Sequence, residues 1–218
     1  MVHGSCPYCA GLLSRRSAAP WDSILADFPT CVVAPTKGSL LPGWLLVIPK
    51  QHSLCAGALT NPEAADAEAA ALWSASRISS FFGPVTMFEH GPARSASPVG
   101  CGVSHSHIHV CSLPFSLSSI VAGTIPPHRM AVYPSMAGSV IPLSYARQCH
   151  RQGLDYTWIR EPTGDVSVIT SPPRQSQFLR RVIAAQLGCP DAFDYRLFPQ
   201  DQNAQATLDR FHGHLQPS

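Results

Sequence analysis

The sequence predicts an α+β protein in which an antiparallel sheet carries a helix on one face. Two apolar runs predict neighbouring strands: residues 30–34 have a β-branched centre, and residues 44–48 form a continuous apolar run that ends at Pro49. Between them, residues 35–43 supply the proline and glycine of a hairpin connection. A helix and two further strands follow, and that order suits an antiparallel sheet.

The clearest helix signal lies after this hairpin. Asn61 offers a cap, Pro62 is compatible with a first helical turn, and Glu63 places an acid near the helix N-terminus. The alanine-rich run that follows extends to about Ser79. The pattern therefore predicts a helix over residues 61–79.

Two more strands are predicted beyond the helix. Gly83 and Pro84 interrupt the helical pattern, and residues 85–89 then predict a strand. Residues 91–102 are rich in Pro, Ser and Gly and predict a loop, after which residues 103–111 predict the next strand. These elements complete the order strand, strand, helix, strand, loop, strand.

The pattern weakens in the second half of the chain, until residues 175–187 predict another helix. Within it, Arg180 and Arg181 could meet a phosphate group, but a solvated helix face is the simpler interpretation. We therefore divide the chain into a domain over residues 1–114 and a C-terminal extension or subdomain of unassigned role over residues 115–218.

The composition argues against several classes of protein. The formal net charge is +2 and charged residues make up 13%, so the strongly basic surface of a nucleic-acid binder is not indicated. No apolar run is long enough to span a bilayer, and the N-terminal residues lack the pattern of a secretory signal. Eight cysteines in such a chain favour reduced thiols or metal ligands over a disulfide framework. We expect a cytoplasmic protein without membrane association.

The most informative stretch is residues 105–110, His-Ser-His-Ile-His-Val. Side chains along a strand alternate between faces, so His105, His107 and His109 are expected to share one face while Ile108 and Val110 point into the core. Each neutral imidazole has one donor and one acceptor to satisfy, which makes these rings poor core material. The pattern therefore favours a metal or catalytic site over a structural role.

Three motifs, in order along the first half of the chain, resemble those of the histidine-triad superfamily. Residues 42–52 are Pro-Gly-Trp-Leu-Leu-Val-Ile-Pro-Lys-Gln-His, residues 88–91 are Phe-Glu-His-Gly, and residues 100–109 are Gly-Cys-Gly-Val-Ser-His-Ser-His-Ile-His. A Cys-x-x-Cys pair, Cys6 and Cys9, precedes them. The resemblance implies a five-stranded antiparallel sheet with helices on one face, and it implies that the first domain is a histidine-triad catalytic domain acting on nucleoside phosphates.

By this resemblance, His107 attacks the α-phosphorus of a nucleotide and His109 contacts the phosphate oxygens. Physical chemistry supports the choice, since a neutral imidazole nitrogen is both a nucleophile and a good leaving group. One difficult displacement is thereby divided into two easier ones. The resemblance assigns substrate and phosphate contacts to six further residues: Glu89, His90, Gly100, Cys101, Gly102 and Ser104.

Some positions depart from the pattern common among relatives. Cys101 stands where many have a glutamine that contacts phosphate, and Trp44 stands where many have a histidine behind the triad. Glu89 and His90 replace a position commonly held by asparagine or aspartate. Because an indole cannot accept a hydrogen bond, we expect Trp44 to pack or to contact substrate.

The spacing of Cys6 and Cys9 allows two thiolates to share one tetrahedral metal ion. In zinc-containing relatives, which include galactose-1-phosphate uridylyltransferases, the set is completed by positions that are His52 and His105 here. The resemblance therefore implies a structural zinc ion that ties the N-terminal segment to the strand carrying His107. The alternative is a mobile cysteine pair with an exposed His52 and no metal.

These motifs support one main hypothesis and two rivals. The main one is a histidine-triad hydrolase, phosphorylase or nucleotidyltransferase that forms a nucleotidyl-histidine and passes the group to water, phosphate or another phosphorylated acceptor. The partner would be a nucleotide or nucleoside phosphate, and a homodimer is a candidate assembly. The first rival is a non-catalytic nucleotide- or RNA-binding module. The second is a metalloenzyme whose triad binds a catalytic ion, which leaves Cys6 and Cys9 without a purpose.

Overall fold

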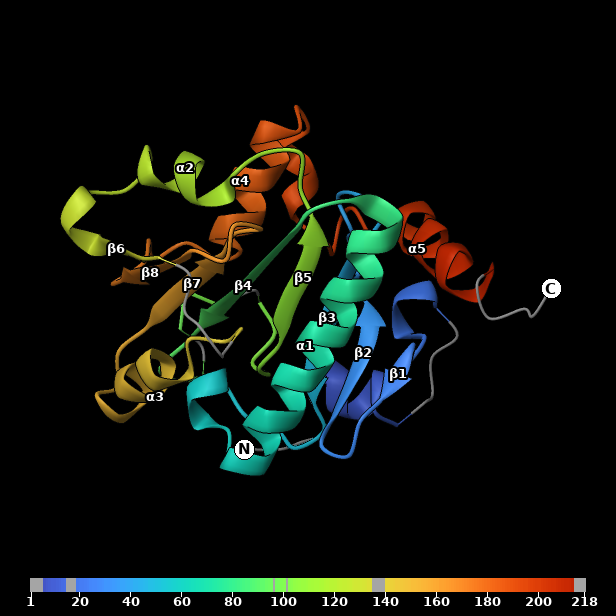
Figure 1. Cartoon of the computed structure of the whole chain (residues 1–218), viewed down its shortest axis with the longest axis horizontal. Helices are drawn as coiled ribbons and strands as arrows, with labels where there is room; N and C mark the ends of the chain where they lie inside the picture. The colour runs from blue at the N-terminus through green and yellow to red at the C-terminus, as the bar shows by residue number, and fades with distance from the viewer. Residues whose placement is uncertain (1–5, 15–18, 96, 101, 135–139, 214–218) are drawn as a thin grey trace.

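An eight-stranded sheet organises the computed structural model, which describes residues 6–14, 19–95, 97–100, 102–134 and 140–213 (Figure 1). The strands lie in the order β1-β2-β3-β5-β4-β7-β8-β6, and all paired neighbours run antiparallel. Their bounds are β1 Ala26–Asp27, β2 Cys31–Pro35, β3 Trp44–Pro49, β4 Val85–Gly91, β5 Ile108–Ser112, β6 Met130–Tyr133, β7 Tyr156–Arg160 and β8 Val166–Thr170. The predicted α+β class with an antiparallel sheet is confirmed.

The expected number of strands is wrong, because the described sheet has eight strands and not five. The additional strands come from the second half of the chain. β7 pairs with β4 from Met87↔Arg160 to Gly91↔Tyr156, and β8 and then β6 continue the sheet. Strands from both sides of residue 114 therefore share one sheet, while the division into domains at that residue remains a prediction.

The predicted hairpin is confirmed as β2 and β3, with Val33 opposite Val47. The strand predicted over residues 103–111 forms only from Ile108 onward. Before it, the backbone bonds to the loop after β3 rather than to a neighbouring strand, since the Ser106 amide donates to the Ser53 carbonyl at 2.6 Å. The first two triad histidines thus lie just outside the regular sheet.

Helix α1, Asn61–Phe82, confirms the predicted helix and runs a little further than expected. Its N-cap is Thr60, one residue earlier than the predicted cap. The side chain of Thr60 accepts from the Glu63 amide at 3.5 Å, and the Glu63 carboxylate accepts from the Thr60 amide at 2.8 Å, which is a capping box. The helix continues until Gly83, whose φ of 108° breaks the helical backbone.

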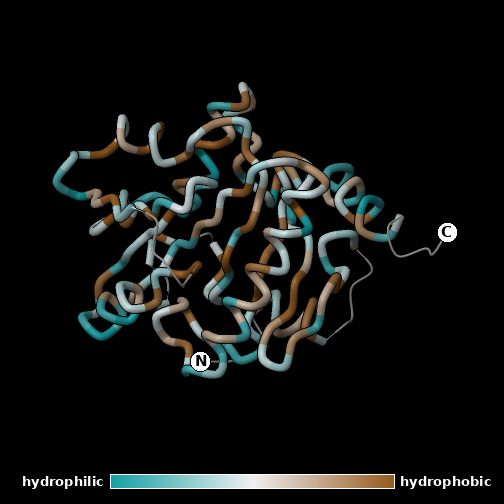
Figure 2. Tube along the Cα trace, in the orientation of Figure 1, coloured by the Kyte–Doolittle hydropathy of each residue, from teal (hydrophilic) through white to brown (hydrophobic). Residues whose placement is uncertain are grey.

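Helices cover both faces of the sheet, so the expectation of helices on one face is wrong. Consecutive residues of β4 show the reason: Met87 packs in the core beneath α1, whereas Phe88 packs in a second core with α4. Both faces of the central strands are apolar, and Figure 2 shows hydrophobic stretches along them. Each face therefore needs a cover. α1 and α3 (Leu143–Arg151) cover one face, and α2 (Leu117–Ala122) and α4 (Phe178–Gln186) cover the other.

The second half contains more regular structure than the sequence pattern suggested. The predicted helix over residues 175–187 is confirmed as α4, and α5 (Asp201–Gly213) packs Phe211 against Phe81 of α1. The shorter helical turns are η2 Tyr8–Leu12, η3 Pro20–Asp22, η4 Ala56–Ala58, η5 Pro127–Arg129 and η6 Pro190–Phe193. Among the described residues, none of the helices combines the length and apolar character needed to cross a bilayer.

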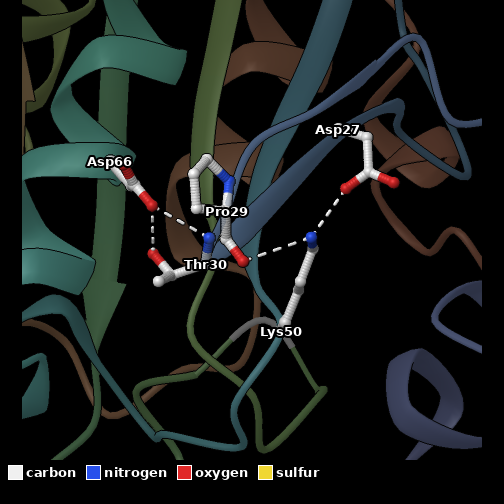
Figure 3. A network of polar contacts seen from close by, with 5 residues as sticks. All are labelled: Asp27, Pro29, Thr30, Lys50 and Asp66. Atoms are coloured by element: carbon white, nitrogen blue, oxygen red, sulfur yellow. Dashed lines mark hydrogen bonds and ion pairs between the residues drawn. The ribbon is translucent and has the colours of Figure 1, made fainter.

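A polar network fixes the ends of β1, β2 and β3 against α1 (Figure 3). The amide and hydroxyl of Thr30 donate to the Asp66 carboxylate at 2.9 and 2.8 Å. The ammonium of Lys50 contacts the Asp27 carboxylate at 2.7 Å and donates to the Pro29 carbonyl at 3.3 Å. Since Lys50 directly follows β3, this network anchors the turn that leads to His52.

Candidate active site and metal site

The structure brings together the four residues predicted to bind metal. Cys6, Cys9, His52 and His105 each offer one ligand atom, and these atoms all lie within 4.8 Å of one another. The Nδ1 atom of His105 lies 3.4 Å from the Cys6 sulfur and 3.5 Å from the Cys9 sulfur. The Nδ1 atom of His52 lies 3.5 Å from the Cys9 sulfur. The N-terminal turn η2 thereby meets the loop after β3 and the start of the triad.

The donor set fits a tetrahedral metal ion. With ordinary zinc bond lengths, sulfur and nitrogen ligands at tetrahedral angles lie about 3.6 Å apart, close to the 3.4–3.5 Å seen here. The Nε2 atom of His105 lies 2.8 Å from the Pro49 carbonyl, which can only accept, so Nδ1 keeps its lone pair toward the thiols. Burial, and next the Cys6 thiol, raises the pKa of Cys9 to about 11, so a cation is needed to hold a thiolate there.

His107 presents a nucleophilic nitrogen to a pocket. Its Nδ1 atom lies 2.7 Å from the carbonyl oxygen of His105 and must donate to it, which leaves the lone pair on Nε2. Burial lowers the pKa of His107 to about 4, so the ring is neutral at pH 7. The ring therefore has the charge state and tautomer that attack on phosphorus requires.

His109 has the opposite tautomer. The indole N–H of Trp44 donates to its Nδ1 atom at 3.0 Å, and an indole has no acceptor, so the proton of His109 lies on Nε2. Burial holds the pKa of His109 well below its usual value. Its ring lies 4.9 Å from that of His107 between centroids and stacks on Phe88. One histidine thus offers a lone pair and its neighbour offers a proton.

Trp44 has a contact that the sequence analysis did not foresee. The expectation of packing is confirmed, because Trp44 is buried in a core cluster beside Phe88. Its indole also donates a hydrogen bond to His109. The expectation considered only whether an indole can accept a hydrogen bond. Because the Trp44 indole can donate, it fixes the tautomer of His109, as a supporting histidine could.

A pocket of about 440 Å³ opens in front of the two rings. His107 and His109 form part of its wall, and Tyr8, Trp21 and Tyr195 provide aromatic faces. Thr36 and Lys37 follow the end of β2, and Asp22 comes from η3. The mixture of aromatic, cationic and hydroxyl groups suits a ligand with a ring at one end and an anionic group at the other.

Arg180 of α4 also lines this pocket, although its side chain is almost fully buried. Its Nη2 atom donates to the Gly38 carbonyl at 2.6 Å and its Nε atom to the Phe193 carbonyl at 3.1 Å. The guanidinium lies 5.2 Å from the centre of the Trp44 ring. The interpretation of a solvated helix face is therefore wrong for Arg180, because α4 packs this side of the helix onto the sheet.

Two of the predicted phosphate contacts, His90 and Glu89, do not line the pocket and have other partners. His90 is buried beside His109, and its Nε2 atom accepts from the Leu179 amide at 3.2 Å, at the start of α4. Burial lowers its pKa to about 3. Glu89 points to the opposite face, where its carboxylate accepts from the Ala56 amide, the Tyr156 and Ser106 hydroxyls and the Trp158 indole, and where burial raises its pKa.

The loop before the triad is held by the second half of the chain. The Gly100 carbonyl accepts from the Gln177 amide at 3.0 Å and from the Ser176 hydroxyl at 3.3 Å. Gly102 has a φ of 82°, in the left-handed region that favours glycine. Ser104 is exposed, and Cys101 lies outside the described residues.

Comparison with known proteins gives the following result. No protein-family model and no curated protein sequence matches the chain. Similar solved structures include a Hit-like protein involved in cell-cycle regulation from Bartonella henselae, with 14% identity, a TM-score of 0.43, and coverage of 69% of this chain and 95% of that chain. Yeast Ap4A phosphorylase Apa2 in complex with AMP has 10% identity, a TM-score of 0.43, and coverage of 78% and 64%.

A structure described as a uridylyltransferase has 10% identity to this chain and a TM-score of 0.46, and the match covers 99% of this chain and 94% of that chain. At these identities and TM-scores, the chemistry of this chain has to be argued from its own residues.

Proposed function

We propose that this chain transfers a nucleotidyl group from a nucleoside phosphate through a covalent intermediate on His107. The observation that carries the proposal is the pair of opposite tautomers at the pocket wall. The carbonyl of His105 leaves the lone pair of His107 on Nε2, while Trp44 leaves the proton of His109 on Nε2. A nucleophile and a hydrogen-bond donor for phosphate oxygens therefore stand side by side.

The reaction consists of two displacements at the same phosphorus. In the first, Nε2 of His107 forms a bond to the α-phosphorus, and the bond from phosphorus to the leaving oxygen breaks. The Nε2 proton of His109 stabilises the phosphate oxygens as their charge grows. In the second, an oxygen of the acceptor attacks phosphorus and the bond to His107 breaks. Water, phosphate or another phosphorylated acceptor would make the protein a hydrolase, a phosphorylase or a nucleotidyltransferase.

The positive charge for the phosphate comes, in this proposal, from the second half of the chain. Arg180 lines the pocket with its guanidinium, already oriented by two backbone carbonyls. Gly100, Cys101, Gly102 and Ser104 remain the proposed phosphate-contacting loop. For Glu89 and His90, burial and existing partners support a positioning role, in which they hold the triad loop and α4 in place.

We propose zinc as the metal of the Cys6, Cys9, His52 and His105 cluster, because two thiols and two imidazoles are the donors this ion prefers. Four protein ligands would fill its coordination shell, so the ion would crosslink the N-terminal turn to the triad and would not activate water. His107, by contrast, is not among the four residues of the cluster.

The proposal is tested by trapping the intermediate. Rapid quenching during turnover of a nucleotide, at a pH that preserves an acid-labile phosphoramidate, should leave one nucleotidyl mass on the peptide containing His107. The variant His107→Ala should lose both the adduct and turnover while keeping its fold and metal content. Full activity of this variant, or an adduct on another residue, would show that the mechanism is wrong. Nucleotide binding without turnover by the unaltered protein would favour the binding-module alternative.

A further inference from the structure

A second pocket, of about 400 Å³, is lined by three arginines and lies apart from the histidine pocket. Arg94 comes from the loop after β4, Arg129 from η5, and Arg174 from the segment between β8 and α4. None of the residues lining this pocket also lines the histidine pocket. Segments that are far apart in the sequence thus bring three arginine residues to the wall of one pocket.

The positive charge in this pocket is not balanced by the described part of the chain. Across the described ranges, none of the three guanidinium groups forms an ion pair or a hydrogen bond. Asp155 is the carboxylate of the lining, and one of its oxygens already accepts from the Ala93 amide at 2.7 Å and the Ser97 hydroxyl at 2.9 Å. The positive charges of the three arginines repel one another, and a bound anion would offset that repulsion.

The backbone around the pocket is held by hydrogen bonds that do not involve the guanidinium groups. Asp155 ties down the loop that carries Arg94, and the hydroxyl of Thr170 donates to the backbone carbonyl of Arg129 at 3.3 Å. Ser171 has a φ of 48°, and two prolines follow it, so its backbone is restricted to an unusual turn. A pocket whose backbone is fixed in advance loses little entropy when a ligand binds.

We propose that this pocket binds the phosphate group of a small phosphorylated molecule. Guanidinium N–H groups match the oxygens of a tetrahedral phosphate, often in pairs, and a phosphate monoester carries about two negative charges at pH 7. Three arginines and one carboxylate leave two net positive charges to meet it. The volume exceeds that of a bare phosphate ion, which favours a phosphate monoester or a diphosphate.

The proposal is independent of the reaction at His107, and a binding experiment tests it. Two-dimensional NMR of the full chain would follow backbone amides during titration with pyrophosphate, inorganic phosphate and sulfate at low ionic strength. We expect pyrophosphate to shift the amides of Ala93, Leu154 and Ser171 with the tightest apparent Kd. Because the guanidinium groups are exposed, the triple variant Arg94→Met, Arg129→Met and Arg174→Met should fold and should bind at least tenfold more weakly.

The control is Arg151→Met, which removes an exposed arginine at the end of α3 outside the pocket and should bind as the unaltered protein does. Thermal unfolding of each variant would verify that the fold is retained. Shifts confined to the histidine pocket, or equal affinity of the triple variant and the control, would overturn the proposal. Equal affinity for sulfate and for the phosphates would contradict the proposal that the pocket binds a phosphate group in particular. Loss of turnover in His107→Ala has no bearing on this titration.

Discussion

His107 and His109 are chemically identical side chains that two different neighbours set to opposite tasks. A carbonyl oxygen can only accept, and an indole N–H can only donate, so each ring is left with one possible neutral tautomer. Burial lowers the pKa of both rings, which keeps them neutral at pH 7. In the proposed mechanism, the roles of His107 as nucleophile and His109 as donor therefore depend on the groups that contact their Nδ1 atoms.

The role of Trp44 leads to the first prediction at this scale. Trp44→Phe removes the N–H that fixes His109, and loss of one hydrogen bond should slow turnover roughly tenfold. ¹⁵N spectra of the imidazole nitrogens should show His109 losing its single tautomer. Trp73→Phe, on α1, is the matched control and should change neither quantity. Unchanged ¹⁵N shifts of His109 in the Trp44 variant would contradict the tautomer assignment.

The second prediction at the residue scale concerns Arg180. Arg180→Met should raise the Kd of a nucleoside monophosphate by about tenfold or more, since hydrogen bonds to charged groups are worth roughly 1.5–3 kcal/mol. The Kd of the corresponding nucleoside should change little. Arg181→Met is the control, because Arg181 instead donates to the Ser176 carbonyl and lies over Phe193.

Arg180 is buried, so its replacement also leaves two carbonyls without a donor. Arg180→Lys keeps the charge and should bind the nucleoside monophosphate better than Arg180→Met does. Equal weakening of nucleoside and nucleotide binding in both variants would show that Arg180 supports the pocket wall and does not contact phosphate.

At the scale of elements, the contact between β4 and α4 is coupled to pH through His90. Burial lowers the pKa of His90 to about 3 and that of His109 well below its usual 6.5. Between pH 6.5 and about 3, the unfolded chain therefore binds a proton at His90 that the folded chain does not, and His109 acts in the same direction. Stability should fall as the pH falls, by up to about 1.4 kcal/mol per pH unit for each histidine.

This dependence is measurable by denaturant unfolding at several pH values. His90→Gln replaces the ring by an amide whose oxygen can still accept from the Leu179 amide. The free energy of unfolding of this variant should depend less steeply on pH, because one fewer proton is taken up on unfolding. His212→Gln, at an exposed position on α5, is the control. A His90 variant with the slope of the unaltered protein would contradict the assignment of a neutral buried ring.

Elements with a local pattern could be predicted from the sequence, and those that depend on distant packing were missed. The β2–β3 hairpin and α1 have apolar periodicity and turn residues of their own. The buried positions of α5, Ala204, Thr207, Leu208 and Phe211, have helical spacing, so a local signal was present but was diluted by polar neighbours. That both faces of β4 are buried could not be predicted from the strand alone, because the second face is covered by the distant helix α4.

The same division applies to the candidate site. The triad could be predicted from its alternating histidines and the cysteine pair from its spacing, whereas His52 and His105 were expected to join Cys6 and Cys9 because of the family resemblance. The side chain of Arg180 enters the pocket only because α4 packs behind β4, which no spacing within the helix reveals. The direction of Glu89 was equally hidden, since consecutive strand residues point to opposite faces and one of two neighbours must turn away.

For the molecule as a whole, the cluster of Cys6, Cys9, His52 and His105 joins three segments that are separated in sequence: the N-terminal segment around η2, the loop after β3 and the start of the triad. The double variant Cys6→Ser and Cys9→Ser should lose about one zinc per chain. Its Tm should fall by about 4 °C or more, equivalent to roughly 1–2 kcal/mol in a chain of this size. Elemental analysis and thermal unfolding measure both effects.

Cys189→Ser is the matched control, since this partly exposed thiol lies outside the cluster and should leave zinc content and Tm unchanged. Protein purified without chelators that contains no zinc, together with a double variant of undiminished Tm, would contradict the metal assignment. Loss of zinc with an unchanged Tm would show that the metal does not contribute to the stability of the fold.

The hydrogen bond between His107 and the carbonyl of His105 has a kinetic consequence. The residue whose ring is the proposed metal ligand also supplies the oxygen that orients the nucleophile, at 2.7 Å. In water an imidazole exchanges freely between tautomers, whereas here the backbone has made the selection before substrate arrives. A metal that never touches substrate would then govern how often a collision is productive, and metal starvation would lower the turnover number before it lowered the amount of folded protein.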